Sequence, residues 1–457
     1  MNLSEITQEQ YNDIFPVPYH IFNSVKFNEL NKYKCEQVNY LLFQDKKKRL
    51  GLIIGRNNNS VSSPFSAPFG CFSFKDEQID IKIIEKSIRV LDFYIREKKI
   101  SSIKFILPPL CYNISFLSKL INALKRNDYN ILYIDLNHIF KTSFLDENYI
   151  NKIYHNARKN LNIALKENLS FIKTEDINLV YNIISENRKT RGLPLMMTFE
   201  QVRETINIIK YDAFVVKFDN DYIASALIYH VAEKIVQVIY WGDIPEFSSK
   251  KTMNFLSYKV FEFYKKAGIE IIDIGPSSQF GIPNYGLCDF KESIGCLIDS
   301  KFIFNKNILN IDFVNYTRVF LDKSWEWLND KEIRELTMTP EFTKEQQETF
   351  FLSLPQRENY FIKGIKFNDK PIGACGLKNI TENCGEYWGY IGEKEFWGQG
   401  IGKEIVKYIV TVAEEKGLKS IWLNVSQNNE RAKNLYLKFG FYVETINDDK
   451  IIMRYNI

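Results

Sequence analysis

Apolar residues follow two alternating patterns along the first part of the chain. Short apolar runs at 50–54, 103–107 and 131–136 predict strands, and the spaced apolar positions of 81–98 predict an amphipathic helix. Together they predict an α/β unit over residues 1–140. Its most turn-rich stretch, 60–70, is rich in serine and proline, and we expect an ordered surface loop there.

The same patterns predict two further units, over residues 141–305 and 306–457. For the second unit the expected helices and strands cover 154–166, 169–174, 177–191, 212–218, 222–230, 235–240, 252–267 and 269–274. The third unit repeats this order, with elements at 324–335, 344–352, 360–367, 371–377, 385–391, a glycine-rich loop with its helix, 421–425, and a last helix and strands. We therefore expect an α/β (α+β) fold of mixed sheets flanked by helices, with the fold of the second unit repeated in the third.

Length and composition limit the possible classes of protein. At 457 residues the chain exceeds the roughly 250–300 residues at which single cores stop growing, so two or three domains are expected. A net charge of +4 does not require a nucleic-acid partner, and the basic cluster 46–49 is interpreted as a solvated turn. No apolar run is long enough for a membrane span, and the seven cysteines and four histidines show no metal-ligand spacing. A cytoplasmic protein without a metal is the default expectation.

The segment Trp397-Gly398-Gln399-Gly400-Ile401-Gly402-Lys403 carries the clearest chemical signal. It lies between an apolar strand that ends at Ile391 and an amphipathic helix over 404–410. Glycine lets a backbone approach an anion closely, and the first amides of a helix offer unpaired N–H donors with partial positive charge. The pattern therefore favours a phosphate-bearing ligand, although a tight strand-to-helix turn without a ligand would look the same.

Three motifs together resemble the GNAT superfamily of acyl-CoA-dependent N-acetyltransferases: 385–392, the loop at 397–403, and 429–441. The resemblance covers 306–457, and it implies acetyl-CoA as the co-substrate, with its pyrophosphate on the amides between Gly398 and Lys403. It also implies pantetheine pairing with the backbone of Tyr390, Ile391 and Gly392. The family usually carries Arg or Gln where this chain has Trp397, which weakens the motif match more than the chemistry.

The resemblance and the residues suggest roles for three further side chains. Tyr436 stands at the position of the family's general-acid tyrosine, and a half-buried core tyrosine is the alternative. With no histidine beyond residue 230, the base that deprotonates the amine must be a carboxylate, a backbone carbonyl or water. Glu386 could be this base, acting directly or through a water. An exposed carboxylate at a strand edge, without a catalytic role, is an equal alternative. Asn429 contacts the CoA arm, caps the last helix, or does both.

Residues 1–305 are similar to FemAB-like proteins in the pattern of 131–136, 154–166, the helix ending at Arg191, the strand end 272–276, and the segments 284–287 and 290–291. That resemblance implies two GNAT-like lobes, 1–140 and 141–305. No Gly-x-Gly loop occurs here, so the helix start at 248–252 is expected to be an ordinary capped one rather than a phosphate site. The polar loop 277–284 either contacts a ligand or is a plain loop.

The leading hypothesis is an acetyl-CoA-dependent N-acetyltransferase that modifies a primary amine. We expect a small-molecule acceptor, the amine of a nucleotide-linked amino sugar in surface-polysaccharide synthesis, because 383–386 and 325–329 resemble amino-sugar acetyltransferases of the pseudaminic-acid type. Acetylation of protein N-termini or lysines is the second enzymatic alternative. A non-catalytic module that binds CoA or a glycan is the third hypothesis.

Overall fold

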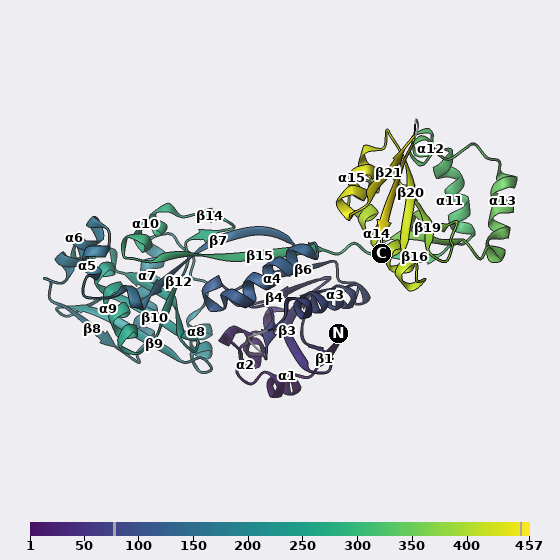
Figure 1. Cartoon of the computed structure of the whole chain (residues 1–457). Helices are drawn as coiled ribbons and strands as arrows, with labels where there is room; N and C mark the ends of the chain where they lie inside the picture. The colour runs from purple at the N-terminus through teal and green to yellow at the C-terminus, as the bar shows by residue number, and fades with distance from the viewer. Residues whose placement is uncertain (76–78, 448–449) are drawn as a thin grey trace. The chain divides into compact units, whose positions relative to one another are not determined.

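The chain divides into two compact units, Met1–Ile308 and Leu309–Ile457, each described here by itself (Figure 1). The computed structural model describes residues 1–75, 79–447 and 450–457. The mixture of strands and flanking helices confirms the α/β fold class. Residues 1–308 form one unit around one continuous sheet, so their division into lobes at 140/141 stays a prediction.

Unit 1 is organised by a mixed sheet of order β1-β2-β3-β4-β6-β15-β7-β12-β11-β10-β9-β8, with β5 paired to β3. Its strands are β1 (Asn2–Ile6), β2 (Gln37–Gln44), β3 (Lys48–Asn57), β4 (Ser60–Ser63), β5 (Ser73–Phe74), β6 (Ser102–Ile106), β7 (Asn130–Lys141), β8 (Leu169–Lys173), β9 (Tyr211–Phe218), β10 (Asp221–Ala232), β11 (Ile235–Asp243), β12 (Ile271–Pro276) and β15 (Leu297–Asn307), with a small hairpin of β13 (Ser278–Gln279) and β14 (Ile282–Pro283). Its helices are α1 (Gln8–Ile14), α2 (Val25–Leu30), α3 (Ile81–Glu97), α4 (Ile114–Arg126), α5 (Tyr149–Lys152), α6 (His155–Ala164), α7 (Ile177–Thr190), α8 (Phe199–Ile206), α9 (Thr252–Lys266) and α10 (Tyr285–Ser293).

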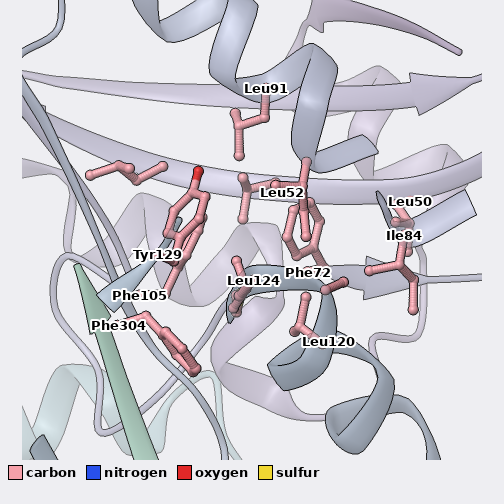
Figure 2. Close-up of a cluster of buried hydrophobic side chains, with 14 of the residues drawn as sticks. Leu50, Leu52, Phe72, Ile84, Leu91, Phe105, Leu120, Leu124, Tyr129 and Phe304 are labelled. Carbon is pink, nitrogen blue, oxygen red and sulfur yellow. The ribbon is translucent and has the colours of Figure 1, made fainter. Parts of the chain in front are cut away.

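Strand β15 joins the two halves of unit 1. It is the last strand of the unit in sequence, yet it lies in the middle of the sheet, antiparallel to both β6 and β7. Its Phe304 is fully buried in the core under α3 and α4, near the stacked rings of Phe105 and Tyr129, as Figure 2 shows. A separate core, with Phe140 stacked on Phe261 at 3.7 Å, lies under α6 and α9. By pairing with β6 and β7, the last strand therefore joins the two halves of unit 1 in one sheet.

The prediction of a surface loop over 60–70 is wrong for its first residues. Ser60–Ser63 form β4, which pairs antiparallel to β3 and parallel to β6 inside the sheet. Val61 and Ser63 are buried and alternate with more exposed neighbours, as a strand requires. Pro64 lacks an amide N–H and ends the strand. The loop was predicted from the serine and proline content of the segment. Pairing with β3 and β6 makes its first residues a strand despite that content.

Unit 2 is a seven-stranded sheet of order β16-β17-β18-β19-β20-β22-β21. Its strands are β16 (Ile311–Asn315), β17 (Phe361–Phe367), β18 (Lys370–Lys378), β19 (Cys384–Ile391), β20 (Ser420–Ser426), β21 (Tyr442–Ile446) and β22 (Lys450–Asn456). Its helices are α11 (Arg318–Asn329), α12 (Lys331–Thr337), α13 (Lys344–Ser353), α14 (Ile401–Glu415) and α15 (Glu430–Phe439). A core of apolar residues from the sheet and α14 lies on one face.

The helix expected over 324–335 is two helices, α11 and α12. They meet at Asp330, whose backbone is extended (ψ 127°) and whose side chain accepts a hydrogen bond from the amide of Ile333. An aspartate in this geometry caps a new helix rather than continuing the old one. The break matters for the site, because α12 lines the cavity described below.

Candidate active site

A cavity of about 680 Å³ lies in unit 2, lined by residues of β19, β20, α12, α15 and the start of α14. Its position follows from the pairing of the two central strands. Strand β19 runs parallel to β20 with pairing only over Cys384–Glu386, and the remainder of β19, as far as Ile391, lines the cavity. Most residues predicted for the site line it, namely Glu386, Tyr390, Ile391, Trp397, Gly398, Gly400, Gly402, Lys403, Asn429 and Tyr436.

Side chains from both faces of the sheet reach this cavity. Successive side chains of a strand point to opposite faces, so Glu386 and Trp388 lie on one face and Tyr387 on the other. Tyr387 belongs to the buried core with α14. Because all three line the same cavity, it passes between the diverging strands. Both the glycine loop and Glu386 line it.

The glycine loop leads into α14 through two left-handed residues. Gly398 has φ +79° and Gly400 has φ +85°, a region that side-chain-bearing residues avoid. A Cβ at Gly398 would meet nothing within 4 Å, so the backbone there is open to a ligand. Gly400 is the N-cap of α14 and provides no side-chain cap. The amides of Ile401 and Gly402, at the start of the helix, therefore stand beside an open loop, whereas the Lys403 amide donates to the Gly400 carbonyl at 3.0 Å.

Positive charge is concentrated around the cavity. Four cationic side chains line it, Lys378, Lys403, Arg431 and Lys450, against the single carboxylate of Glu386 among the described lining residues. The Arg431 guanidinium lies 5.0 Å from the centre of the Trp397 ring, and the Trp397 indole donates to the Ile391 carbonyl at 2.8 Å. The tryptophan that replaces the family's Arg or Gln thus supports a cation beside the loop. This charge fits the phosphates of CoA.

Three residues predicted for the cofactor site lie outside the cavity lining. The Gly392 amide donates to the Ile372 carbonyl at 2.7 Å, so only the carbonyl of Gly392 remains a candidate for pairing with pantetheine, and that pairing stays a prediction. The exposed Gln399 side chain turns back and donates to the carbonyl of Glu395. Ile401 is fully buried in the core beneath α14. For Gln399 and Ile401 only the backbone remains a candidate for phosphate contact.

Tyr436 is half-buried on α15 and combines the two roles considered from sequence. It packs against the core of unit 2 and also lines the cavity. Its ring stands edge-on to that of Tyr387, with 6.0 Å between centres. Burial raises the pKa of Tyr436 to about 12, and the hydrogen bond with Tyr387 opposes part of that rise. The phenol therefore stays protonated at neutral pH and can donate a hydrogen bond.

Glu386 is a buried carboxylate with three polar partners, not an exposed group at a strand edge. It is 5% exposed. Asn379 donates to Oε2 at 2.8 Å, and Asn424 donates to Oε1 at 2.9 Å. The Lys378 ammonium lies 3.2 Å from Oε1. These contacts hold the carboxylate in place and balance its charge.

Sequence reasoning did not single out Asn424. The signal is present in β20, where Ile421, Leu423 and Val425 are all buried in the core. Alternation therefore places Asn424 on the other face, beside β19. Recognising its contact with Glu386 also requires the parallel register of the two strands, which the pattern alone does not provide.

Asn429 caps α15, as one of its two interpretations expected. Its Oδ1 accepts from the amide of Ala432 at 3.1 Å, and its Nδ2 donates to the carbonyl of Leu336 in α12 at 3.3 Å. The side chain therefore ties α15 to α12 at the edge of the cavity. A contact with the CoA arm stays a prediction.

Comparison with known proteins separates the two units. Residues 324–441 match the model of the acetyltransferase (GNAT) family. The GCN5-related N-acetyltransferase 6, chloroplastic, of Arabidopsis thaliana is 26% identical over 106 residues, 21% of this chain and 37% of that protein. The chain thus spans little more than a third of the length of that curated relative.

Solved structures add the fold of the larger part. A crystal structure of FemX covers 68% of this chain and 98% of its own, with a TM-score of 0.51 and 13% identity. The N-acetyltransferase PseH of Campylobacter jejuni covers 32% of this chain and 97% of its own, with a TM-score of 0.27 and 19% identity. In the described ranges, no helix is both long and apolar enough to cross a bilayer. The second unit is thus a domain of the acetyltransferase (GNAT) family, joined to a larger part of the chain that has a FemX-like fold.

Proposed function

We propose that unit 2 transfers an acetyl group from acetyl-CoA to a primary amine. One observation carries the proposal: the glycine-rich start of α14 and the pair Glu386 and Tyr436 line one continuous cavity between β19 and β20. The glycine loop suits the phosphates of the acyl donor, and the carboxylate and the phenol suit the proton transfers of the reaction. The match of residues 324–441 to the GNAT family supports the same activity.

The cofactor's charged end would bind at the glycine loop. The pyrophosphate would accept hydrogen bonds from amides between Gly398 and Lys403, where the helix N-terminus contributes partial positive charge. The side chains of Lys403 and Arg431, which line the same part of the cavity, add full charges. The pantetheine arm would follow the edge of β19 between Tyr387 and Ile391, like an added strand.

The transfer itself requires few protein groups. The amine nitrogen attacks the thioester carbonyl carbon, so an N–C bond forms and the C–S bond breaks. The proton lost by the nitrogen passes to the Glu386 carboxylate, directly or through a water, and then to solvent. The sulfur leaves as a thiolate. Glu386 suits this role because its partners hold it at the wall of the cavity.

Tyr436 would stabilise the leaving thiolate mainly by a hydrogen bond. An alkyl thiol has a pKa of about 8.5, whereas burial raises the pKa of Tyr436 to about 12. Full transfer of the phenolic proton to the thiolate is therefore uphill, and solvent completes the protonation. A donor that strengthens its bond as charge develops on sulfur favours the transition state over the bound substrate.

For the acceptor we propose the amine of a nucleotide-linked amino sugar in surface-polysaccharide synthesis. Two features support this choice: the sequence resemblance of 325–329 and 383–386 to amino-sugar acetyltransferases, and the excess of cations around the cavity. An acceptor that carries a diphosphate is attracted by such a lining, whereas a basic peptide or a polyamine is repelled. Acetylation of lysines is therefore the weaker alternative.

The test combines binding with turnover. Calorimetry with acetyl-CoA measures the affinity of the cofactor, and thiol release is followed with amino-sugar nucleotides, spermidine and lysine peptides as acceptors. We expect binding, and turnover that is fastest with an amino-sugar nucleotide. Turnover of peptides alone would contradict the acceptor. Binding of acetyl-CoA without turnover of any amine, unchanged in Tyr436→Phe, would favour a binding module instead.

A further inference from the structure

Two buried polar atoms in unit 2 lack a protein partner, and both belong to residues that line the cavity. Among the described residues of this unit, the buried side-chain nitrogens and oxygens without a hydrogen bond are Nε1 of Trp388 and Oδ1 of Asn424. Buried polar groups in folded proteins are nearly always paired, because an unpaired one loses its bonds to water without compensation. Two exceptions on the wall of the same cavity point to a ligand that pairs with them.

The orientation of the Asn424 amide is determined by Glu386. A carboxylate only accepts hydrogen bonds, so the Asn424 end that faces Glu386 Oε1 at 2.9 Å is the NH₂ group. The carbonyl Oδ1 is therefore the free end. Asn379 holds the other carboxylate oxygen, so the carboxylate cannot turn without breaking that bond. The result is an acceptor oxygen fixed beside the proposed base.

Trp388 offers the complementary donor. It lies two residues after Glu386 on β19, so both side chains project from the same face of the strand. Its ring packs against Tyr360, with 6.0 Å between centres, and against Tyr390, with 6.4 Å. The indole N–H can only donate. Trp388 and Tyr360 both line the cavity and give it an aromatic wall beside Glu386.

We propose that Asn424 and Trp388 together recognise the acceptor molecule. Asn424 Oδ1 accepts an N–H of the amine while Glu386 takes its proton, and Trp388 Nε1 donates to an oxygen of the same molecule. The aromatic wall covers an apolar face of the acceptor, as aromatic rings do for sugar rings. The preferred acceptor is therefore an amine on an oxygen-bearing ring and not a plain alkylamine. This inference rests on the proposed transferase function and assigns the residues that select its amine.

Paired variants separate recognition from general structural damage. Asn424→Ala removes both the free oxygen and one donor to Glu386, whereas Asn379→Ala removes only the other donor to Glu386. Trp388→Phe removes the indole N–H and keeps an aromatic ring. Trp325→Phe is its matched control, because Trp325 packs on Phe342 outside the cavity lining.

The kinetic test uses the fastest amine of the panel described above. We expect Asn424→Ala to raise KM for the amine about tenfold more than Asn379→Ala does, and Trp388→Phe to raise it several-fold over Trp325→Phe, as lost hydrogen bonds predict. The affinity for acetyl-CoA should change less than twofold in all four variants. Equal effects within each pair would overturn the inference and leave the transferase function standing. Weaker acetyl-CoA binding in Trp388→Phe would also overturn it, by assigning the N–H to the cofactor.

A second readout does not depend on turnover. The chain has six tryptophans, and the indole N–H signal of Trp388 is identified in a nitrogen-15 NMR spectrum by its loss in Trp388→Phe. With CoA present, addition of an amino-sugar nucleotide should shift this signal and leave that of Trp325 in place. A Trp388 signal that moves with none of the panel amines contradicts the recognition pair, whether or not the enzyme turns over.

Discussion

Helices α9 and α14 start in similar ways and differ in what surrounds the start. Each unit pairs two central strands in parallel over a short register, Ile235–Gln237 with Ile271–Asp273 in unit 1 and Cys384–Glu386 with Ser420–Trp422 in unit 2. In each unit a helix lies between these strands in sequence and begins after a left-handed residue. The agreement supports the duplicated fold expected from the order of elements.

The two helix starts differ in the residue that makes the left-handed turn. In unit 2 it is Gly400, with φ +85°, in a loop beside the cavity. In unit 1 it is Lys251, with φ +57°, and its neighbour Lys250 is bound to Glu167 at 2.8 Å and lies over the Phe218 ring. The N-cap residue of α9 is Lys251, and its side chain makes no capping hydrogen bond. The same turn is therefore covered by side chains in unit 1 and lies open in unit 2, where we propose the anion site.

The largest effect is expected from placing a side chain in the open turn. Gly400→Glu adds both left-handed strain and a negative charge where the pyrophosphate would bind, so acetyl-CoA should bind at least about 100-fold more weakly. Calorimetry measures the loss. Gly417→Glu is the matched control, because Gly417 is also left-handed (φ +74°) but lies after the other end of α14. Equal losses in both variants would show a general effect of strain.

Removal of the proposed base comes next. Glu386→Gln keeps the size of the side chain but replaces one of its two accepting oxygens with an NH₂ group and loses the ion pair with Lys378. It cannot accept the amine proton, so kcat/KM should fall about 100- to 1,000-fold. Acetyl-CoA affinity should stay within twofold. A variant that keeps near-full turnover would show that water or a backbone carbonyl removes the proton.

Loss of the phenol should cost less than loss of the base. Tyr436→Phe removes the hydrogen bond to the thiolate and should lower kcat about 10- to 100-fold, with acetyl-CoA affinity nearly unchanged. Because the pKa of Tyr436 is raised to about 12, the phenol stays protonated through pH 10. Activity of the wild-type protein should therefore show no loss from this group below about pH 11. A loss of wild-type activity between pH 9 and 10 that is absent in Tyr436→Phe would contradict the assignment.

The smallest effect is expected in unit 1. Lys251→Gly removes the steric strain of a left-handed lysine, but glycine loses more backbone entropy on folding. The two effects oppose each other, so the free energy of unfolding should change by less than about 1 kcal/mol. It should not create a second acetyl-CoA site, because Lys250, Glu167 and Phe218 still fill the region. Denaturant unfolding and calorimetry check the two statements. A new binding event in this variant would show that glycine alone makes the site.

Local patterns were enough to predict most elements and the loop. Helix α9 and strand β19 lie within a few residues of their predicted limits, because their apolar periodicity is regular. Gly398 and Gly400 were identified because alternating glycines between a strand and a helix let the backbone approach an anion, and the structure adds that both residues are left-handed. These features depend on neighbours in sequence, which is why the sequence reveals them.

Features built from distant segments could not be predicted. The bond between Asn424 and Glu386 joins residues 38 positions apart and depends on the register of β20 beside β19. The central position of β15 depends on two partners far earlier in the chain, β6 and β7. The hydrogen bond from the Gly392 amide to the Ile372 carbonyl likewise joins two segments that are distant in sequence. Such contacts require a known sheet order before they can be inferred.

Calorimetric titration of the full chain with acetyl-CoA tests the central claim most directly. The claim is that each chain has one acetyl-CoA site and that the glycine loop binds the pyrophosphate there. It predicts one molecule bound per chain, binding abolished by Gly400→Glu and retained in Gly417→Glu. Two molecules bound per chain, or affinity unchanged in Gly400→Glu, would contradict it.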